Sequence, residues 1–338
     1  MAAPDSRGAL APNARVLVVH VARIGDTLLI TPALRALKQA IPTGRLGCLL
    51  HPARRELLEG LPFIDELGAI TPKTAWWRGR LNVQHWDMAV VYGHDAALIR
   101  YAARVAERVV AFDQHDETLD AMLWKAVPTP TAPMHAVHER LLLPAAFGIE
   151  TRDYRLAYAP SAPELAAAKD WLARHTVATR PLVGFQVASF QTKSYRDWPL
   201  DRFIELGRRL LARHPEARIL VFGGNESRGH ADTLARALGV RVISLAGALR
   251  LRVTAALMAQ LDLYVGVDTG PTHLAGALRV PMVALYHCRH RGRYLAPLQH
   301  EHLRVLEHPA TDDDCRTTLP MSDITVDQVW NAVESLPA

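Results

Sequence analysis

Short apolar runs alternate with segments of helical period along most of the chain. The first run, RVLVVHVA at residues 15–22, is continuously apolar and rich in valine, which is typical of a strand buried on both faces of a parallel sheet. Behind it, apolar residues recur at helical spacing until Pro42 ends the predicted helix. Further strands are expected at 46–51, 65–70, 87–93 and 107–113.

The same alternation restarts after a proline-containing stretch at 151–180, which is a candidate linker. Strands are expected at 181–188, 217–224, 241–247, 261–268 and 281–287, with helices between them. A β-α-β order implies parallel sheets with right-handed crossovers. The sequence therefore predicts an α/β protein with two Rossmann-like domains facing a central cleft, and a ligand at the carboxyl ends of the strands.

These patterns also suggest where the domains begin and end. Residues 1–14 are expected to form a disordered leader, residues 15–160 the first domain and residues 161–338 the second. The final helix, DITVDQVWNAVESL, is assigned to the second domain, with packing back on the first domain as an option.

Composition excludes several classes of protein. The 338 residues include no apolar run of the roughly 20 residues that span a bilayer, and the first residues lack the apolar region of a secretory signal. The three cysteines form no CxxC pair, which argues against a disulfide framework and favours a reducing cytoplasm. The net charge of +5 fits an anionic partner such as a nucleotide, a phosphorylated glycolipid or a membrane surface, and fits simple solubility equally well.

The most informative segment is VGVDTGPTHLAGAL at 265–278. A predicted strand ends at Asp268, and Thr269 and Gly270 lead into a helix whose free N–H groups and positive dipole end suit a diphosphate. The hydroxyls of Thr269 and Thr272, together with His273, offer further contacts to such a group. The alternative is that Asp268 or Thr269 only caps the helix.

A second carboxylate stands at the corresponding place in the first half. Asp26 follows Gly25 at the start of the first predicted helix. A carboxylate there could act as the general base that deprotonates an acceptor hydroxyl. The alternative is again a helix N-cap.

Other clusters carry weaker signals. A GxGxxG turn after the first strand and a GxxxxGK[ST] loop are both absent from the sequence, so a dinucleotide dehydrogenase and a P-loop enzyme are not supported. His135 and His138 have a spacing that could hold a metal, but no partner set accompanies them, and no metal site is expected. No nucleic-acid-binding module is recognised. The basic loop at 287–293 could close over the donor or meet an anionic acceptor, and a plain surface loop explains it equally well. The carboxylates at 312–314 lie in a polar loop and are expected to be solvated.

An aromatic and basic cluster lies at 76–80, with the sequence WWRGR. Tryptophan faces beside arginines suit the head group of an acidic glycolipid at a membrane surface. Tryptophans buried in the core are the competing explanation.

In order from about residue 15 to 335, the chain resembles glycosyltransferase family 9, the heptosyltransferases. The resemblance rests on RVLVVHVARIGDTLLITPALRALKQAIP, FQTKSYRDWPLDRFIELGRRL, FGGNESRGHADTLA and DLYVGVDTGPTHLAGALRVPMVALY. It implies a GT-B fold, and metal-independent, inverting transfer of heptose from ADP-heptose to the inner core of lipopolysaccharide, without a cofactor. An enzyme at the cytoplasmic face of the inner membrane, with an anionic glycolipid acceptor and no nucleic-acid partner, is therefore expected.

The resemblance also implies roles for individual residues. Asp26 matches the catalytic base, and the residues that match donor contacts are Lys193, Arg196, Glu226, Asp268, Thr269, Gly270 and His273. The candidates for acceptor binding are His20, Arg23, Trp76 and Arg78.

The chain departs from the family pattern at several positions. His20 stands where a lysine is usual, Ala22 and Arg23 replace a serine-rich turn, and Arg196 replaces a lysine. HCRHRGRYLAP replaces the usual turn after the last strand. Two alternatives stay open: transfer of another sugar from a nucleotide donor to a different glycan, and a non-catalytic relative that only binds a nucleotide sugar.

Overall fold

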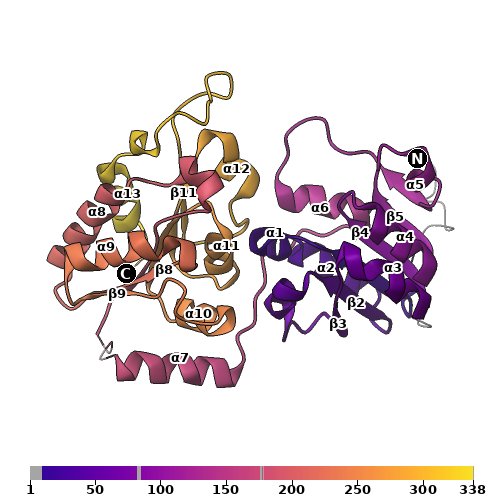
Figure 1. The fold of residues 1–338 in the computed structure, drawn as a ribbon, viewed down its shortest axis with the longest axis horizontal. Helices are drawn as coiled ribbons and strands as arrows, with labels where there is room; N and C mark the ends of the chain where they lie inside the picture. Colours follow the sequence, from indigo (N-terminus) through magenta and orange to yellow (C-terminus); the bar gives the residue numbers. More distant parts are fainter. Residues whose placement is uncertain (1–9, 82–84, 176, 178, 338) are drawn as a thin grey trace. The chain divides into compact units, whose positions relative to one another are not determined.

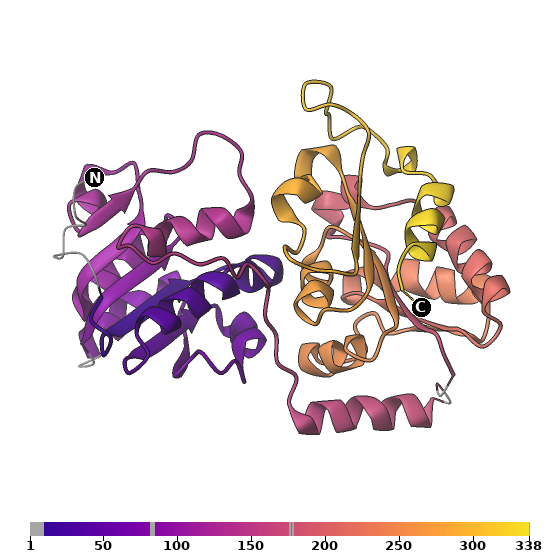
Figure 2. The same cartoon turned by 180° about the vertical axis from the view of Figure 1, so that it is seen from behind.

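The computed structural model describes residues 10–81, 85–175, 177 and 179–337. The chain forms two compact units that divide between Ala159 and Pro160. Each unit is built on a parallel six-stranded sheet with helices on its faces, as Figures 1 and 2 show from opposite sides. The predicted α/β class with two Rossmann-like units is therefore confirmed.

The sheet of the first unit has the order β3-β2-β1-β4-β5-β6. Its strands are β1 (Arg15–His20), β2 (Arg45–Leu50), β3 (Glu66–Ala69), β4 (Trp86–Tyr92), β5 (Ala106–Phe112) and β6 (Lys125–Val127). The chain runs outward from β1 in one direction as far as β3, and then returns to the other side at β4. The point between β1 and β4 is thus a topological switch point, where loops diverge and leave room for a ligand.

The two faces of this sheet have separate cores. Val16 and Val18 of β1 pack on one face, beneath α2 (Thr31–Ala40) and α6 (Ala136–Ala145). Because side chains alternate along a strand, Leu17 and Val19 point to the other face. That face is covered by α3 (Pro72–Leu81), α4 (Ala96–Val105) and α5 (Glu117–Asp120). The short helix α1 (Ile24–Leu29) contacts α2 and α6, and η1 (Pro52–Leu58) is a 3-10 helix after β2.

The second unit repeats this plan with the strand order β12-β11-β10-β7-β8-β9. Its strands are β7 (Leu182–Gln186), β8 (Arg218–Phe222), β9 (Val242–Ser244), β10 (Leu263–Val267), β11 (Met282–Tyr286) and β12 (Leu303–Glu307). Its helices are α7 (Ala162–Arg174), α8 (Leu200–Arg213), α9 (Arg228–Leu238), α10 (Leu251–Met258), α11 (Gly270–Ala277), α12 (Gly292–Leu295) and α13 (Val326–Glu334). Four 3-10 helices complete it: η2 (Gln191–Arg196), η3 (Asn225–Ser227), η4 (Cys288–His290) and η5 (Met321–Asp323). The switch point lies between β7 and β10.

Several elements differ from the sequence prediction. The edge strands β6 and β12 were not expected, because neither has a continuous apolar run: two of the three residues of β6 are exposed, and those of β12 are mostly half-buried. The first predicted helix is divided at Ile30, and α2 begins at Thr31 with Pro32 in its first turn. The segment 71–86, which shows no clear period, contains α3. By contrast, the helix expected within the linker candidate, PELAAAKDWLARH, forms as α7, and an ion pair between Glu164 and Arg252 holds it against α10.

Residues 1–9 of the predicted leader lie outside the described residues, whereas Leu10 and Ala14 pack against the core of the first unit because both side chains are apolar. Val326, Val329 and Ala332 of α13 lie in the core of the second unit, so the option that this helix packs back on the first domain is not needed to bury them. Within the described ranges, every helix is too short or too polar to cross a bilayer.

Candidate functional site

The switch point of the second unit brings two predicted residues together. Asp268 directly follows β10, and Arg196 ends η2 in the loop after β7, the neighbouring strand. Arg196 Nη1 lies 2.7 Å from Asp268 Oδ2, although 72 residues separate the two in the sequence. The Asp268 side chain is only 4% exposed and that of Arg196 15%. A buried carboxylate needs such a partner, so this ion pair defines the geometry of the site.

A histidine on η4 extends this pair. His290 Nε2 lies 2.9 Å from Arg196 Nη2 and 2.7 Å from the hydroxyl of Tyr195. Burial, followed by the charge of Arg196, lowers the pKa of His290 to about 4. The imidazole is therefore neutral near pH 7, and since a guanidinium can only donate, Nε2 accepts the hydrogen bond from Arg196. His290 fixes the orientation of the guanidinium without competing for its charge.

The start of α11 is not capped by a side chain. Thr269 occupies the N-cap position with extended backbone, and its hydroxyl lies 3.3 Å from the carbonyl of Val267. The hydroxyl of Thr272 donates to the same carbonyl, so it does not offer the ligand contact that the sequence suggested. Since neither the Asp268 nor the Thr269 side chain makes a capping hydrogen bond to the helix, the alternative that one of them serves as a side-chain cap is wrong. Gly270 begins the helix, and the backbone N–H groups of the first turn of α11 are suited to bind an anion.

The remaining donor candidates lie on helical elements that follow β10, β7 and β8. His273 Nε2 is 3.7 Å from Asp268 Oδ1, inside α11. Lys193 is half-buried on η2, three residues before Arg196. Glu226 is exposed on η3 after β8, and its carboxylate folds back over Gly224, where an added Cβ would lie 2.4 Å from both carboxylate oxygens. Among the described residues, no hydrogen bond or ion pair joins Glu226 to Asp268.

In the first unit, Asp26 occupies the first turn of α1, directly after β1 and its switch point. Arg23 holds the N-cap position, so the alternative in which Asp26 caps the helix is wrong. Asp26 Oδ1 lies 3.1 Å from Arg140 Nη2, and its side chain remains 42% exposed. Arg140 comes from α6, 114 residues later in the chain. The pair orients a charged carboxylate that solvent still reaches.

His20 supports this turn from inside the unit. It is 5% exposed, packs edge-on against Tyr92, and places Nε2 3.3 Å from the carbonyl oxygen of Asp26. Burial, and then the charge of Arg140, lowers the pKa of His20 to about 4, so the ring is neutral near pH 7. The hydroxyl of Tyr92 donates to the carbonyl of Arg140 at 2.8 Å, which ties α6 to the same cluster. Arg23 lies on the exposed side of the turn.

Trp76 and Arg78, the other acceptor candidates, lie elsewhere. They belong to α3, which covers the face of the sheet opposite α2 and α6. Trp76 is 57% exposed and the neighbouring Trp77 44%, so the explanation as core tryptophans is wrong. The Arg78 guanidinium donates to the carbonyl of Ala69 at the end of β3. The four predicted acceptor residues therefore divide into two separate groups.

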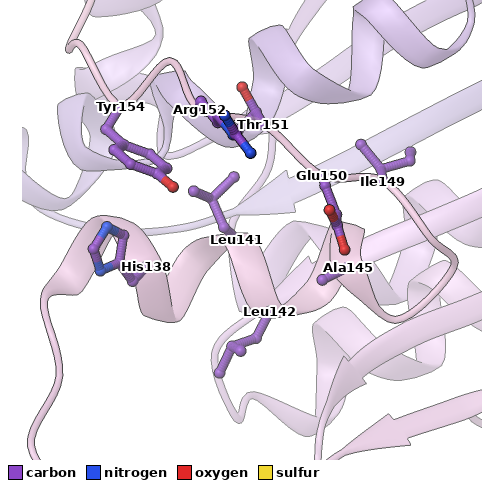
Figure 3. A pocket seen from close by; sticks show the side chains of 9 residues that line it. All are labelled: His138, Leu141, Leu142, Ala145, Ile149, Glu150, Thr151, Arg152 and Tyr154. Atoms are coloured by element: carbon purple, nitrogen blue, oxygen red, sulfur yellow. The ribbon is translucent and has the colours of Figure 1, made fainter.

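A pocket of about 500 Å³ lies beside α6 in the first unit (Figure 3). Its lining combines leucines with polar and aromatic groups: His138, Leu141, Leu142, Ala145, Ile149, Glu150, Thr151, Arg152 and Tyr154. The rings of His138 and Tyr154 meet edge to face, 4.8 Å apart. The mixture of aromatic faces, a guanidinium and a carboxylate suits a saccharide. The helix that carries Arg140 also lines this pocket.

The basic loop 287–293 has mostly structural roles. Arg291 is 7% exposed, and it pairs with Asp312 and Glu307. Arg293 pairs with Asp312 as well. His290 is the exception, because it contacts Arg196. Of the two histidines considered for metal binding, His135 is the N-cap of α6 and accepts from Val137 N, and the ring of His138 packs against Tyr154.

Cys288 and Cys315 form a disulfide, with their Cα atoms 5.8 Å apart. The number and spacing of the cysteines argued against a disulfide framework, so this one disulfide was not expected. Both cysteines lie in loops that follow neighbouring parallel strands, β11 and β12, and so reach the same edge of the sheet. His287 lies beside them, and within the described ranges these three residues form the one group with metal-ligand geometry. In the disulfide state the two sulfurs are not thiolates and cannot serve as such ligands.

Thiol counting tests the disulfide. Protein unfolded without reductant should react at one cysteine, Cys48, which is free and buried in the native fold, and protein unfolded with dithiothreitol should react at all three. Reduction should lower the free energy of unfolding of the second unit by about 3–4 kcal/mol, because the bond closes a loop of 27 residues. The Cys48→Ser variant should keep the whole effect of reduction. Three reactive thiols before reduction would show that the bond does not form.

Residues 90–320, more than half of the chain, match the family model of glycosyltransferase family 9 (heptosyltransferase). Lipopolysaccharide heptosyltransferase 3 of Escherichia coli K12 is 25% identical over 285 residues, which cover 78% of this chain and 79% of that protein.

Solved structures show the same fold. The glycosyl transferase family 9 protein of Veillonella parvula superposes with a TM-score of 0.81 at 19% identity, covering 97% of this chain and 98% of that one. The E. coli ADP-heptose lps heptosyltransferase II gives a TM-score of 0.77 at 20% identity, covering 95% and 98%. The two parallel sheets thus correspond to the two Rossmann-like halves of the GT-B fold. The chain belongs to glycosyltransferase family 9, the heptosyltransferase family.

Proposed function

We propose that this glycosyltransferase moves heptose from ADP-heptose to the inner core of lipopolysaccharide, with inversion at the anomeric carbon and without a metal ion. The observation that carries the proposal is the state of Asp26. Its carboxylate is paired with Arg140, is not used as a helix cap, and remains 42% exposed at a switch point. Such a group can remove the proton of an acceptor hydroxyl as the oxygen attacks. The names of the E. coli relatives support the choice of donor and acceptor.

The second unit supplies what the leaving group needs. Negative charge grows on the diphosphate as the glycosidic bond breaks, and groups already oriented toward that charge lower the barrier most. Arg196, held by Asp268 and His290, the nearby Lys193, and the uncapped start of α11 provide such groups. His273 and Thr269 are proposed as further donor contacts, and Glu226 as the acceptor of hydrogen bonds from ribose or sugar hydroxyls.

The acceptor side is proposed to use the first unit. An anionic glycolipid at the cytoplasmic face of the inner membrane would present its sugar to Asp26, with Arg23 and the pocket beside α6 as places for neighbouring saccharide groups. His20 is proposed to act indirectly, since it is buried beneath the turn that carries Asp26.

Transfer of radiolabelled heptose from ADP-heptose to truncated lipopolysaccharide core tests the proposal. The protein should transfer label to the core, and the rate should be the same after treatment with a chelator and dialysis. Heat-denatured protein is the control. Binding of the donor without transfer to any truncated core would contradict the proposed reaction, and loss of transfer in chelator that a divalent ion restores would contradict metal independence.

A further inference from the structure

Two adjacent exposed tryptophans have no role in the site described above. Among the residues that the structure describes, seven large hydrophobic side chains are exposed: Trp76, Trp77, Met122, Trp124, Phe190, Val240 and Val305. Trp76 and Trp77 are neighbours on α3, where Ala75 is completely buried and anchors the helix to the core. The outward position of the two rings is therefore fixed by the packing of the helix rather than by a mobile loop.

The surrounding surface is basic. Helix α3 packs beside α4, on the same face of the sheet (Figure 1). Lys73 on α3 and Arg100 and Arg104 on α4 are exposed. Neither helix contains an acidic residue. Asp95, which precedes α4, uses its carboxylate to cap that helix.

The basic surface has a defined boundary. Arg100 lies within electrostatic reach of Asp116, the N-cap of α5, and Glu107 is exposed just beyond the end of α4. We call the residues inside this boundary, namely Lys73, Trp76, Trp77, Arg100 and Arg104, the α3–α4 face.

Tryptophan beside lysine and arginine is the combination that suits the interface of an anionic bilayer. Indole rings are enriched at the level of the lipid head groups, because one part of the ring is apolar and the N–H is polar. Basic residues next to them are attracted by the negative potential of an anionic leaflet. Two short helices whose outer residues carry both features present them on one side of the unit.

We propose that the α3–α4 face docks the protein on the surface of an anionic lipid bilayer. This inference rests on the proposed function in one respect: the proposed acceptor is a membrane-bound glycolipid, so docking on the membrane would bring the enzyme to its substrate. Asp26 and Arg140 belong to helices on the opposite face of the sheet. Docking on lipid and the transfer reaction can therefore be tested with different variants.

Sedimentation with lipid vesicles tests this surface. The wild-type protein should bind vesicles of phosphatidylethanolamine and phosphatidylglycerol, and should bind vesicles of phosphatidylcholine alone much more weakly. Both Trp77→Ala and the double variant Lys73→Glu/Arg104→Glu should weaken binding to the anionic vesicles by about tenfold or more, and salt should weaken binding of the wild type. Trp124→Ala is the matched control, because Trp124 is also exposed but lies outside the α3–α4 face, where it stacks with Arg108. It should bind as the wild type does.

Two further readouts separate the possible results. Transfer to a delipidated, soluble core oligosaccharide should be unchanged in the Trp77→Ala variant, so a failure of the proposed transferase function would appear in that assay and not in sedimentation. Equal binding of wild type and both variants would overturn the proposal, as would absence of wild-type binding. A wild-type dimer that becomes monomeric in Trp77→Ala would also overturn it, because the face would then be an interface between two copies.

Discussion

Replacement of Asp26 by asparagine should lower kcat for transfer by about 10²–10⁴-fold, the usual contribution of a general base. Asparagine keeps the shape of the side chain, and its carbonyl oxygen can still accept from Arg140 Nη2, so the turn should be preserved. The affinity for ADP should be unchanged, because the proposed donor residues belong to the other unit. Initial rates with the truncated core, and calorimetry with ADP, measure the two quantities.

The neighbouring carboxylate provides a matched control. Glu139 Oε1 pairs with Arg140 Nη1 at 2.8 Å, so Glu139→Gln changes a carboxylate on the same guanidinium without touching Asp26. This variant should keep nearly the wild-type rate. Arg140→Gln should give an intermediate loss in kcat, because Asp26 then keeps its charge but loses its orientation. Asp26 would be excluded as the base if its asparagine variant kept a rate similar to that of Glu139→Gln.

Replacement of Arg196 by glutamine should have two large effects. Asp268 would become a buried carboxylate without a charged partner, which should lower the free energy of unfolding by about 3–5 kcal/mol. The dissociation constant for ADP should rise by about 10–100-fold, because a charge-assisted hydrogen bond to phosphate contributes about 1.5–3 kcal/mol. Chemical denaturation and calorimetry report the two effects separately.

An arginine on the surface of the same unit is the control for this change. Arg209 pairs with Glu205 and Asp327, and its side chain is 36% exposed. Arg209→Gln should cost less than about 1 kcal/mol, because exposed ion pairs contribute little, and should leave ADP binding unchanged. Equal stability of the two variants would show that the pair with Asp268 does not support the fold, and unchanged ADP binding in Arg196→Gln would remove Arg196 from the donor site.

The sequence predicted the central part of the fold because local signals dominate there. Continuous apolar runs identify β1, β4, β7, β8, β10 and β11, which are buried on both faces. The carboxyl end of such a strand is visible in the sequence, so Asp26 and Asp268 could be placed at the sheet edge. The edge strand β12 could not be found in this way, because its residues are only half-buried and carry Arg304 and Glu307 among the apolar positions.

What the sequence could not show were the partners of these carboxylates. Arg140 is one of many arginines in the chain, and no local sequence pattern connects it with Asp26. His290 stands in a basic loop in which Arg291 and Arg293 form structural ion pairs, and nothing in the sequence distinguishes it from them. Its contact with Arg196 arises because β11 and β7 both lie next to β10 in the sheet. The disulfide could not be predicted for the same reason. A separation of 27 residues does not show that two cysteines are close, and only the pairing of β11 with β12 brings them together.

The link between Asp26 and Arg140 also affects the order in which the first unit is completed during synthesis. The loop after β1 leaves the ribosome early, whereas α6 is the last helix before the division at Ala159. A contact over 114 residues cannot form until nearly the whole unit is available, and contacts of such separation form slowly because a long loop must close first. A nascent chain that ends before α6 therefore holds the Asp26 carboxylate without its guanidinium, and the pair that orients the proposed base is among the last parts of this unit to form.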